Sequence, residues 1–168
     1  MLNVPPTLNR DDIERRIPHQ GSMCLLDAVL AWDSERIHCE TRSHLDPHHP
    51  LRAHDRLGAA CGVEYAAQAM AVHGALVAES QGSGNTASAP PPAGFLASMR
   101  GVTLHVERLD TVAGPLTVNA ERLSGDVHTV LYSFTLQSGN QTLVSGRAAV
   151  VLDGTGISPG PATSRNAA

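Results

Sequence analysis

The chain has 168 residues, 42% hydrophobic and 17% charged, a composition that fits one globular domain and argues against disorder over most of its length. Its net charge of −4 gives no electrostatic basis for nucleic-acid binding, so no nucleic-acid partner is expected. The three cysteines lie far apart without a CxxC pair, and the N-terminal residues are polar. These features predict a reduced, cytoplasmic protein without a secretory signal.

The N-terminal third of the sequence alternates short apolar segments with polar turns. In chain order it predicts an arm at residues 1–9, a short helix at 11–17 capped by Asn9 or Asp11, and two strands at 23–32 and 36–42 joined at Ser34 and Glu35. The next segment, residues 44–56, has two prolines and predicts a loop. This loop holds four histidines: His44, His48, His49 and His54.

Residues 57–78, LGAACGVEYAAQAMAVHGALVA, predict one long helix, because alanine is the strongest helix former. Asp55 is the expected N-cap. The segment is long enough to span a bilayer, and Gly58-x-x-x-Gly62 imitates a membrane dimer motif. Polar side chains interrupt it at Glu64 and Gln68, so no membrane span is expected.

After this helix the sequence turns to β structure. The predicted elements are a flexible connector at 79–93, strands at 94–109, 115–123, 127–137 and 142–152, and a disordered tail at 153–168. Compact hairpin turns are expected at residues 124–126 and 138–140, and a bend at Arg100-Gly101. Residues 10–152 therefore predict a single α+β domain, an antiparallel sheet curled around the helix. Its exposed sheet edges favour a dimer.

Several motifs together resemble a known family. They are IPH at residues 17–19 with MCLLD at 23–27, HPLR at 49–52, GVEYAAQAMA at 62–71, GFLASMR at 94–100 and GRA at 146–148. The combination resembles the hotdog-fold 3-hydroxyacyl-ACP dehydratases, above all the branch associated with aryl polyene and related lipid gene clusters. The resemblance covers residues 10–152 and implies a dimeric hotdog fold that removes water from a 3-hydroxyacyl thioester on acyl carrier protein.

The resemblance also implies catalytic residues. Better-known members carry a carboxylate on the helix of one subunit and a histidine in a G-H-F-P loop of the other, and Glu64 matches the carboxylate. The G-H-F-P motif is absent here, so the histidine is open: His54 is nearest the expected place, His19 belongs to the matching PH motif, and His44 is a third candidate. His48 and His49 are expected to be exposed.

The chemistry assigns roles to these residue types. A histidine is suited to take the C2 proton, and Glu64 to protonate the departing hydroxyl. Backbone N–H groups of Gly58 and Ala59 at the helix N-terminus are candidate donors to the thioester oxygen. Gln68, one turn after Glu64, is expected either to hold the Glu64 carboxylate by a hydrogen bond or to form a dimer contact, and it is counted with Gly58 and Ala59 among the candidate substrate-binding residues.

Other side chains have plainer interpretations. His73 is expected to be a packed or interface histidine, Asp27 to be structural and Cys61 to be a small core residue. The loop histidines lack a recognised ligand spacing, so neither a metal nor a cofactor is expected.

Two other functions stay open at this stage. A hotdog thioesterase activates water with a similar carboxylate, and a non-catalytic hotdog subunit would stabilise an active partner. The absent G-H-F-P loop favours the non-catalytic subunit. The expected partners are an acyl carrier protein, docked on a patch that includes Arg15, Arg16 or Arg100, and either a second copy or a related hotdog subunit.

Overall fold

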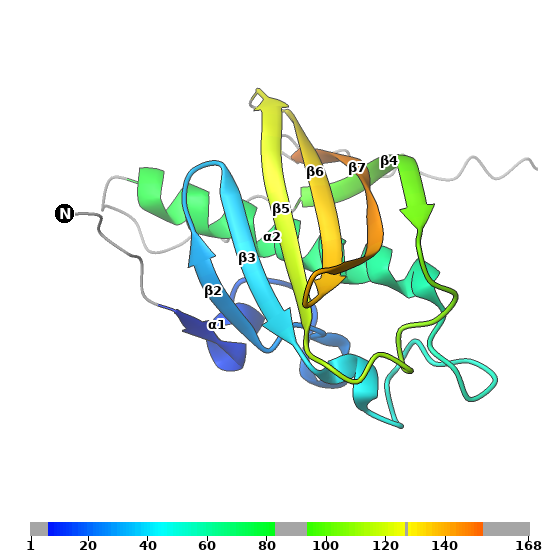
Figure 1. The fold of residues 1–168 in the computed structure, drawn as a ribbon. Coiled ribbons are helices and arrows are strands. Elements are labelled where there is room, and N and C mark those ends of the chain that lie inside the picture. Colours follow the sequence, from blue (N-terminus) through cyan, green and yellow to red (C-terminus); the bar gives the residue numbers. More distant parts are fainter. Residues whose placement is uncertain (1–6, 83–93, 127, 153–168) are drawn as a thin grey trace, which may run out of the picture.

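The computed structural model describes residues 7–82, 94–126 and 128–152 (Figure 1). Its elements are β1 (Leu8–Asn9), α1 (Arg10–Glu14), β2 (Ala28–Trp32), β3 (Arg36–Thr41), α2 (Gly62–Gln81), β4 (Gly94–Leu104), β5 (Leu116–Gly125), β6 (Thr129–Ser138) and β7 (Gln141–Leu152), with short 3-10 turns at Gly21–Met23, Ser43–Leu45 and Ala59–Cys61. The strands form one antiparallel sheet in the order β1-β2-β3-β5-β6-β7-β4.

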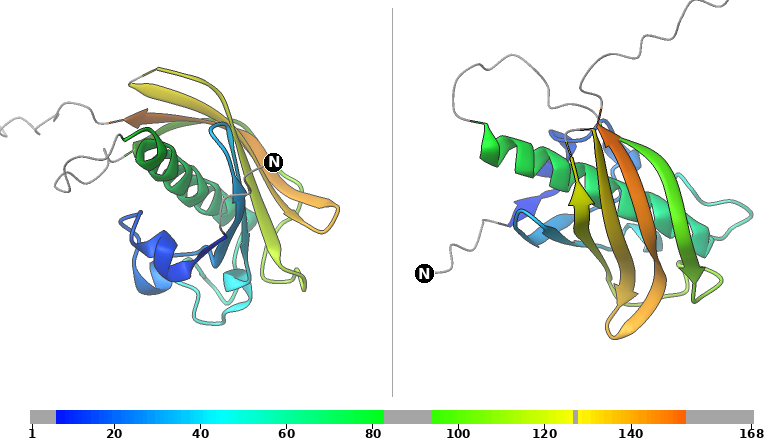
Figure 2. Two further views of the ribbon diagram at one scale, coloured as in Figure 1. Left: turned by 90° about the vertical axis from the view of Figure 1, so that its left-hand side faces the viewer. Right: turned by 90° about the horizontal axis from the view of Figure 1, so that it is seen from above.

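The sheet curves around α2, which lies in its concave face (Figure 2). The helix is apolar on nearly every side because the sheet and the N-terminal segment cover it together; Tyr65, Ala69 and Val72 are fully buried. The core is built mainly from aliphatic side chains, and Tyr65, Tyr132 and Phe134 are its buried aromatic residues. The α+β arrangement expected from the order of elements is therefore confirmed.

The helix begins later than predicted. Leu57 and Gly58 lie before the 3-10 turn at Ala59–Cys61, and this part of the chain pairs with the segment after β4: the Leu109 N–H donates to the Leu57 carbonyl at 2.8 Å, and the Ala59 N–H donates to the Glu107 carbonyl at 3.0 Å. The prediction that Asp55 caps the helix is wrong, because Asp55 is exposed at φ 58° and Cys61 occupies the cap position. Long-range pairing takes the backbone groups that a longer helix would use.

The N-terminal segments also differ from prediction. Leu8–Asn9, expected in an arm, form β1 and pair with β2; residues 1–6 lie outside the described part of the chain. Asn9 caps α1 as predicted, and Asp12 completes a capping box. The strand expected from residue 23 begins only at Ala28, because residues 21–23 form a 3-10 turn.

The β-rich half agrees more closely. The hairpins β5–β6 and β6–β7 are formed, and Gly139 takes φ 56° in the second turn. The bend predicted at Arg100-Gly101 is confirmed by a register shift against β7 and by φ 58° at Gly101. β4 ends at Leu104 instead of residue 109. Most of the connector predicted at 79–93 and the tail at 153–168 lie outside the described residues. The first residues of the predicted connector belong to α2, which ends at Gln81.

Two helical glycines give a matched pair for testing how tightly α2 packs. A Cβ on Gly62 would lie 2.9 Å from the side chains of Leu136 and Val144, whereas one on Gly74 would meet no atom within 4 Å. Gly62→Ala should therefore lower the free energy of unfolding by about 1–3 kcal/mol through overpacking. Gly74→Ala should raise it by about 0.5–1 kcal/mol through helix propensity. Urea denaturation measures both, and a stabilising Gly62→Ala would contradict the packing.

The burial of His73 is expected to make the free energy of unfolding depend on pH. It is fully buried, accepts from the Tyr132 hydroxyl at Nδ1 (2.7 Å) and donates from Nε2 to the Asp33 carbonyl (2.9 Å), so it is packed as expected. Burial lowers the pKa of His73 in the folded state. As pH falls below the unfolded-state value of ~6.5, the unfolded chain binds protons that the folded state resists, so the free energy of unfolding decreases.

The measurement compares urea denaturation of the wild type and His73→Gln at about pH 7.5 and about pH 5.5. The variant should lose less stability on acidification, because its share of the proton linkage is gone. His54→Gln, at an exposed loop position, is the control and should follow the wild type. Equal losses in the wild type and His73→Gln would contradict the assignment.

Candidate active site

Glu64 lies in the first turn of α2, with its side chain half-buried. Two nitrogens contact the same carboxylate oxygen: Gln68 Nε2 lies 3.0 Å and His19 Nε2 lies 3.1 Å from Oε1. The structure thus brings together three of the predicted site residues. Oε2 makes no hydrogen bond or ion pair with the residues that the structure describes.

His19 reaches Glu64 from the loop between α1 and the 3-10 turn at Gly21–Met23. Its Nδ1 atom is buried and has no hydrogen-bond partner in the part of the chain that the structure describes. Nε2, which faces the carboxylate, is therefore the ring nitrogen with a partner. We call Glu64 and His19 the carboxylate–imidazole pair.

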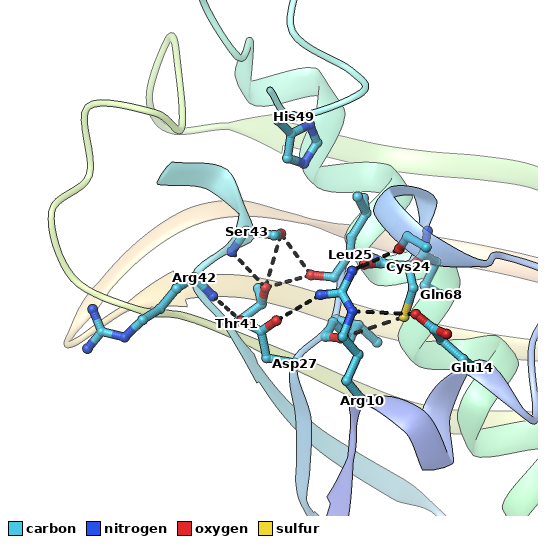
Figure 3. Close-up of polar contacts among 12 residues, drawn as sticks. Arg10, Glu14, Cys24, Leu25, Asp27, Thr41, Arg42, Ser43, His49 and Gln68 are labelled. Carbon is cyan, nitrogen blue, oxygen red and sulfur yellow. Dashed lines mark hydrogen bonds and ion pairs between the residues drawn. The ribbon is translucent and has the colours of Figure 1, made fainter. Parts of the chain in front are cut away.

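Arg10 holds the loop that carries His19 (Figure 3). One guanidinium nitrogen donates to the carbonyls of Gly21 (2.9 Å) and Cys24 (2.6 Å), and the other donates to Asp27 Oδ1 at 3.1 Å. Asp27 Oδ2 accepts the Arg42 N–H at 2.7 Å. The structural role predicted for Asp27 is confirmed: it links this loop to the end of β3.

Gln68 connects the same loop to α2. Its side chain is fully buried, and its Oε1 accepts the Leu25 N–H at 2.8 Å while its Nε2 donates to the Met23 carbonyl at 2.8 Å and to Glu64. The prediction that Gln68 holds the Glu64 carboxylate is confirmed. Since the two backbone groups demand opposite ends of the amide, the orientation of Gln68 is fixed.

The loop histidines occupy different environments. His54 is exposed at φ 52° in the turn closed by Ala53 and Arg56, and it makes no polar contact with Glu64 in the described structure. His48 is exposed as expected. His49 is not: it is 5% exposed, which corrects the prediction of a solvent-facing residue. His44 is also buried, and its Nε2 contacts the Val112 carbonyl.

The two predicted oxyanion donors are the backbone N–H groups of Gly58 and Ala59. The Ala59 N–H already donates to Glu107, so the structure corrects the expectation that it serves a substrate oxygen. The donor role of Gly58 stays a prediction. Within the described residues, no three His, Cys, Asp or Glu side chains cluster as metal ligands, and no helix is long and apolar enough to cross a membrane.

Sequence reasoning missed one functional feature. Tyr65, adjacent to Glu64, is fully buried with its hydroxyl 2.9 Å from His49 Nε2 and 2.8 Å from Ser43 Oγ. A tyrosine in an otherwise alanine-rich helix is the available signal, because a buried tyrosine hydroxyl needs a partner. Its partners come from a distant loop and were not deducible from spacing.

The fold and the site together define the class. The chain has the hotdog architecture: it superimposes on the dehydratase heterocomplex ApeI:P from Xenorhabdus doucetiae with a TM-score of 0.70 at 20% identity, covering 83% of this chain and 90% of that one. It matches the mutant thioesterase PA1618 from Pseudomonas aeruginosa with a TM-score of 0.58 at 11% identity, covering 89% of this chain and 96% of that one. It matches the thioesterase HI1161 from Haemophilus influenzae with a TM-score of 0.56 at 12% identity, covering 90% and 94%. Likenesses at such identities establish the fold.

The family is narrower than the fold. A model described as ApeP dehydratase matches residues 11–154, and the chain belongs to this ApeP-like dehydratase family. The resemblance noted in the motifs is thereby confirmed. No curated protein sequence matches the chain.

Arg10 generates a prediction about the loop that presents His19. Arg10→Met removes donors to two carbonyls and to Asp27, so the free energy of unfolding should fall by about 1–2 kcal/mol. Amide exchange at Met23 and Cys24 should accelerate. Arg15→Met is the matched control: its pair with Asp12 is exposed, and its loss should cost at most about 0.5 kcal/mol. Equal effects of the two variants would refute the anchoring role.

Proposed function

We propose that this protein removes water from a 3-hydroxyacyl thioester carried on acyl carrier protein, giving the trans-2-enoyl thioester, in fatty-acid-like or polyene biosynthesis. The carboxylate–imidazole pair is the observation that carries the proposal. Membership of a dehydratase family supports the reaction class. The elimination needs one group to accept the C2 proton and another to protonate the hydroxyl, and Glu64 and His19 supply two such groups 3.1 Å apart.

The hydrogen bonds favour one division of roles. Both Gln68 and His19 present nitrogens to Oε1, an arrangement in which a carboxylate accepts and the imidazole donates from Nε2. We therefore assign Glu64 as the base and His19 as the acid, the reverse of the roles expected from residue types alone. His54, exposed and away from Glu64, is given no part.

The proton balance closes within the pair. Glu64 takes the C2 proton through Oε2, the C–H electrons form the C2=C3 double bond, and the C3–O bond breaks. His19 acts in this step as an imidazolium ion paired with the Glu64 carboxylate. It gives its Nε2 proton to the departing hydroxyl, which leaves as water, and the ring is left neutral with its remaining proton on Nδ1. Transfer of one proton from the Glu64 carboxyl to His19 then restores both groups.

The free edge of the sheet supports association with a second hotdog subunit. β4 is an edge strand, and Leu96, Val102 and Leu104 on it are exposed apolar residues. Pairing along β4 with a second copy or with a related subunit would cover them. One solved relative is titled a heterocomplex, which makes a heterodimer a natural candidate for this chain.

The carrier partner is acidic in chemistry, so its docking patch should contain unpaired arginines. Arg15 and Arg16 form ion pairs with Asp12 and Glu79, whereas Arg100 is exposed. Arg100 is therefore the favoured member of the predicted patch. The cysteines Cys24, Cys39 and Cys61 are free, which fits our placement of the reaction in the reducing cytoplasm.

The test follows a 3-hydroxyacyl-ACP by mass spectrometry with wild type, Glu64→Gln, His19→Gln and His54→Gln. The Glu64 and His19 variants should lose about 10²–10⁴-fold in rate, because each removes one proton-transfer group. His54→Gln is the matched histidine control and should retain full rate. The assay is run with the chain alone and with an added hotdog partner.

Other outcomes identify the alternatives. Release of free acid would indicate a thioesterase. Dehydration only in the presence of the partner, unchanged by Glu64→Gln, would indicate a non-catalytic subunit. Full dehydratase activity of Glu64→Gln in the chain alone would overturn the assignment of Glu64.

A further inference from the structure

Two sets of hydrogen bonds, joined through the backbone of Leu25, connect His49, 15 residues before Glu64 in the sequence, to the Glu64 carboxylate. The direction of these hydrogen bonds depends on which ring nitrogen of His49 carries the proton. The Leu51 N–H donates to Nδ1 at 3.1 Å, so Nδ1 must be the bare ring nitrogen. Nε2, 2.9 Å from the Tyr65 hydroxyl, then carries the proton and donates. Burial lowers the pKa of His49, which keeps the ring in this neutral form.

The direction of the next bonds follows. Because Tyr65 accepts from His49, its own proton goes to Ser43 Oγ at 2.8 Å. Ser43 in turn donates to the Leu25 carbonyl at 2.8 Å, and Thr41 donates to the same carbonyl. Both side chains point at Leu25 in Figure 3. None of these side-chain atoms is buried without a partner in the described structure.

The backbone of Leu25 passes the constraint to the site. Its carbonyl accepts from the hydroxyls of Thr41, the last residue of β3, and Ser43, in the 3-10 turn that follows, and its N–H, on the other side of the Leu25 Cα, donates to Gln68 Oε1. Gln68 then donates to Glu64 Oε1. The position of the Leu25 backbone therefore sets where Gln68 places the carboxylate, and Tyr65 and His49 set the position of Ser43.

We propose that Tyr65 and His49 are positioning residues for Glu64, acting through Ser43, the backbone of Leu25 and Gln68. Neither touches the reacting atoms. Their effect is on the geometry of Glu64 and His19, because the same amide of Gln68 also holds the loop of His19 through the Met23 carbonyl. The proposal rests on the proposed function for its kinetic consequence alone; the linkage itself is independent of the reaction.

The structure supplies a matched control for the test. Tyr132 is buried like Tyr65, and its hydroxyl contacts a buried histidine, His73, at 2.7 Å. This second pair is not connected to Glu64 by any hydrogen bond of the described residues. Tyr65→Phe and Tyr132→Phe therefore delete the same atom from a buried tyrosine–histidine hydrogen bond, and only the first deletion interrupts the connection to Glu64.

The kinetic arm measures dehydration of a 3-hydroxyacyl-ACP by the full chain, with its hotdog partner where activity requires one, at a temperature where all variants are folded. Tyr65→Phe should lower kcat by about 10- to 100-fold with little change in KM, because misplacing a catalytic group affects the transition state. Tyr132→Phe should keep the wild-type kcat. In a Gln68→Ala background, Tyr65→Phe should have no further effect on kcat, since Gln68 transmits it. Additive losses, or equal losses in both tyrosine variants, would overturn the proposal.

A second arm needs no turnover. The side-chain NH2 resonances of Gln68 in 15N-labelled protein should shift in Tyr65→Phe and stay in place in Tyr132→Phe. The neutral ring of His49 should be the Nε2–H tautomer in the wild type. Unshifted Gln68 resonances in Tyr65→Phe would overturn the linkage. If these shifts are seen but the wild type dehydrates nothing, the proposed function fails and the linkage stands.

Discussion

The buried amide of Gln68 is the constraint on which the site depends. An amide inside an apolar helix is costly unless its hydrogen-bonding groups are paired. Gln68 meets this requirement with Leu25 and Met23 on one segment and Glu64 on its own helix. The pairing fixes the loop of His19 against α2, so the same bonds that satisfy the amide assemble the carboxylate–imidazole pair.

The polar side chains of α2 contact different segments of the protein at different positions along the helix. At the N-terminal end of α2 the polar side chains Glu64 and Gln68 face the loop before β2, and Tyr65 faces the loop after β3. Further along, His73 ties α2 to β6 and to the β2–β3 turn. The helix can therefore be apolar almost everywhere and still be oriented uniquely, because each polar side chain has partners in only one arrangement.

The proposed chemistry does not depend on a G-H-F-P loop. The exposed turn that carries His54 has a structural role. Asp110 accepts the Leu57 N–H, just after this turn, and forms ion pairs with Arg52 and Arg108, so the chain is held in place before α2. The pair with Arg108 also lowers the pKa of Asp110, so the anchor stays ionised. In our proposal the catalytic imidazole is that of His19. His49, buried in the loop before α2, helps to position the Glu64 carboxylate through hydrogen bonds.

The sequence by itself determined the elements and the acid. Alternation and hairpin turns predicted β5, β6 and β7 closely, and alanine content predicted α2, because these signals are local. The single carboxylate in an apolar helix identified Glu64 for the same reason. Only the tertiary structure decided which imidazole meets Glu64, that His49 is buried, that the Ala59 N–H is occupied and that the helix begins at Gly62. Each of these depends on contacts between segments far apart in the chain, where sequence spacing carries no information about which groups will pair.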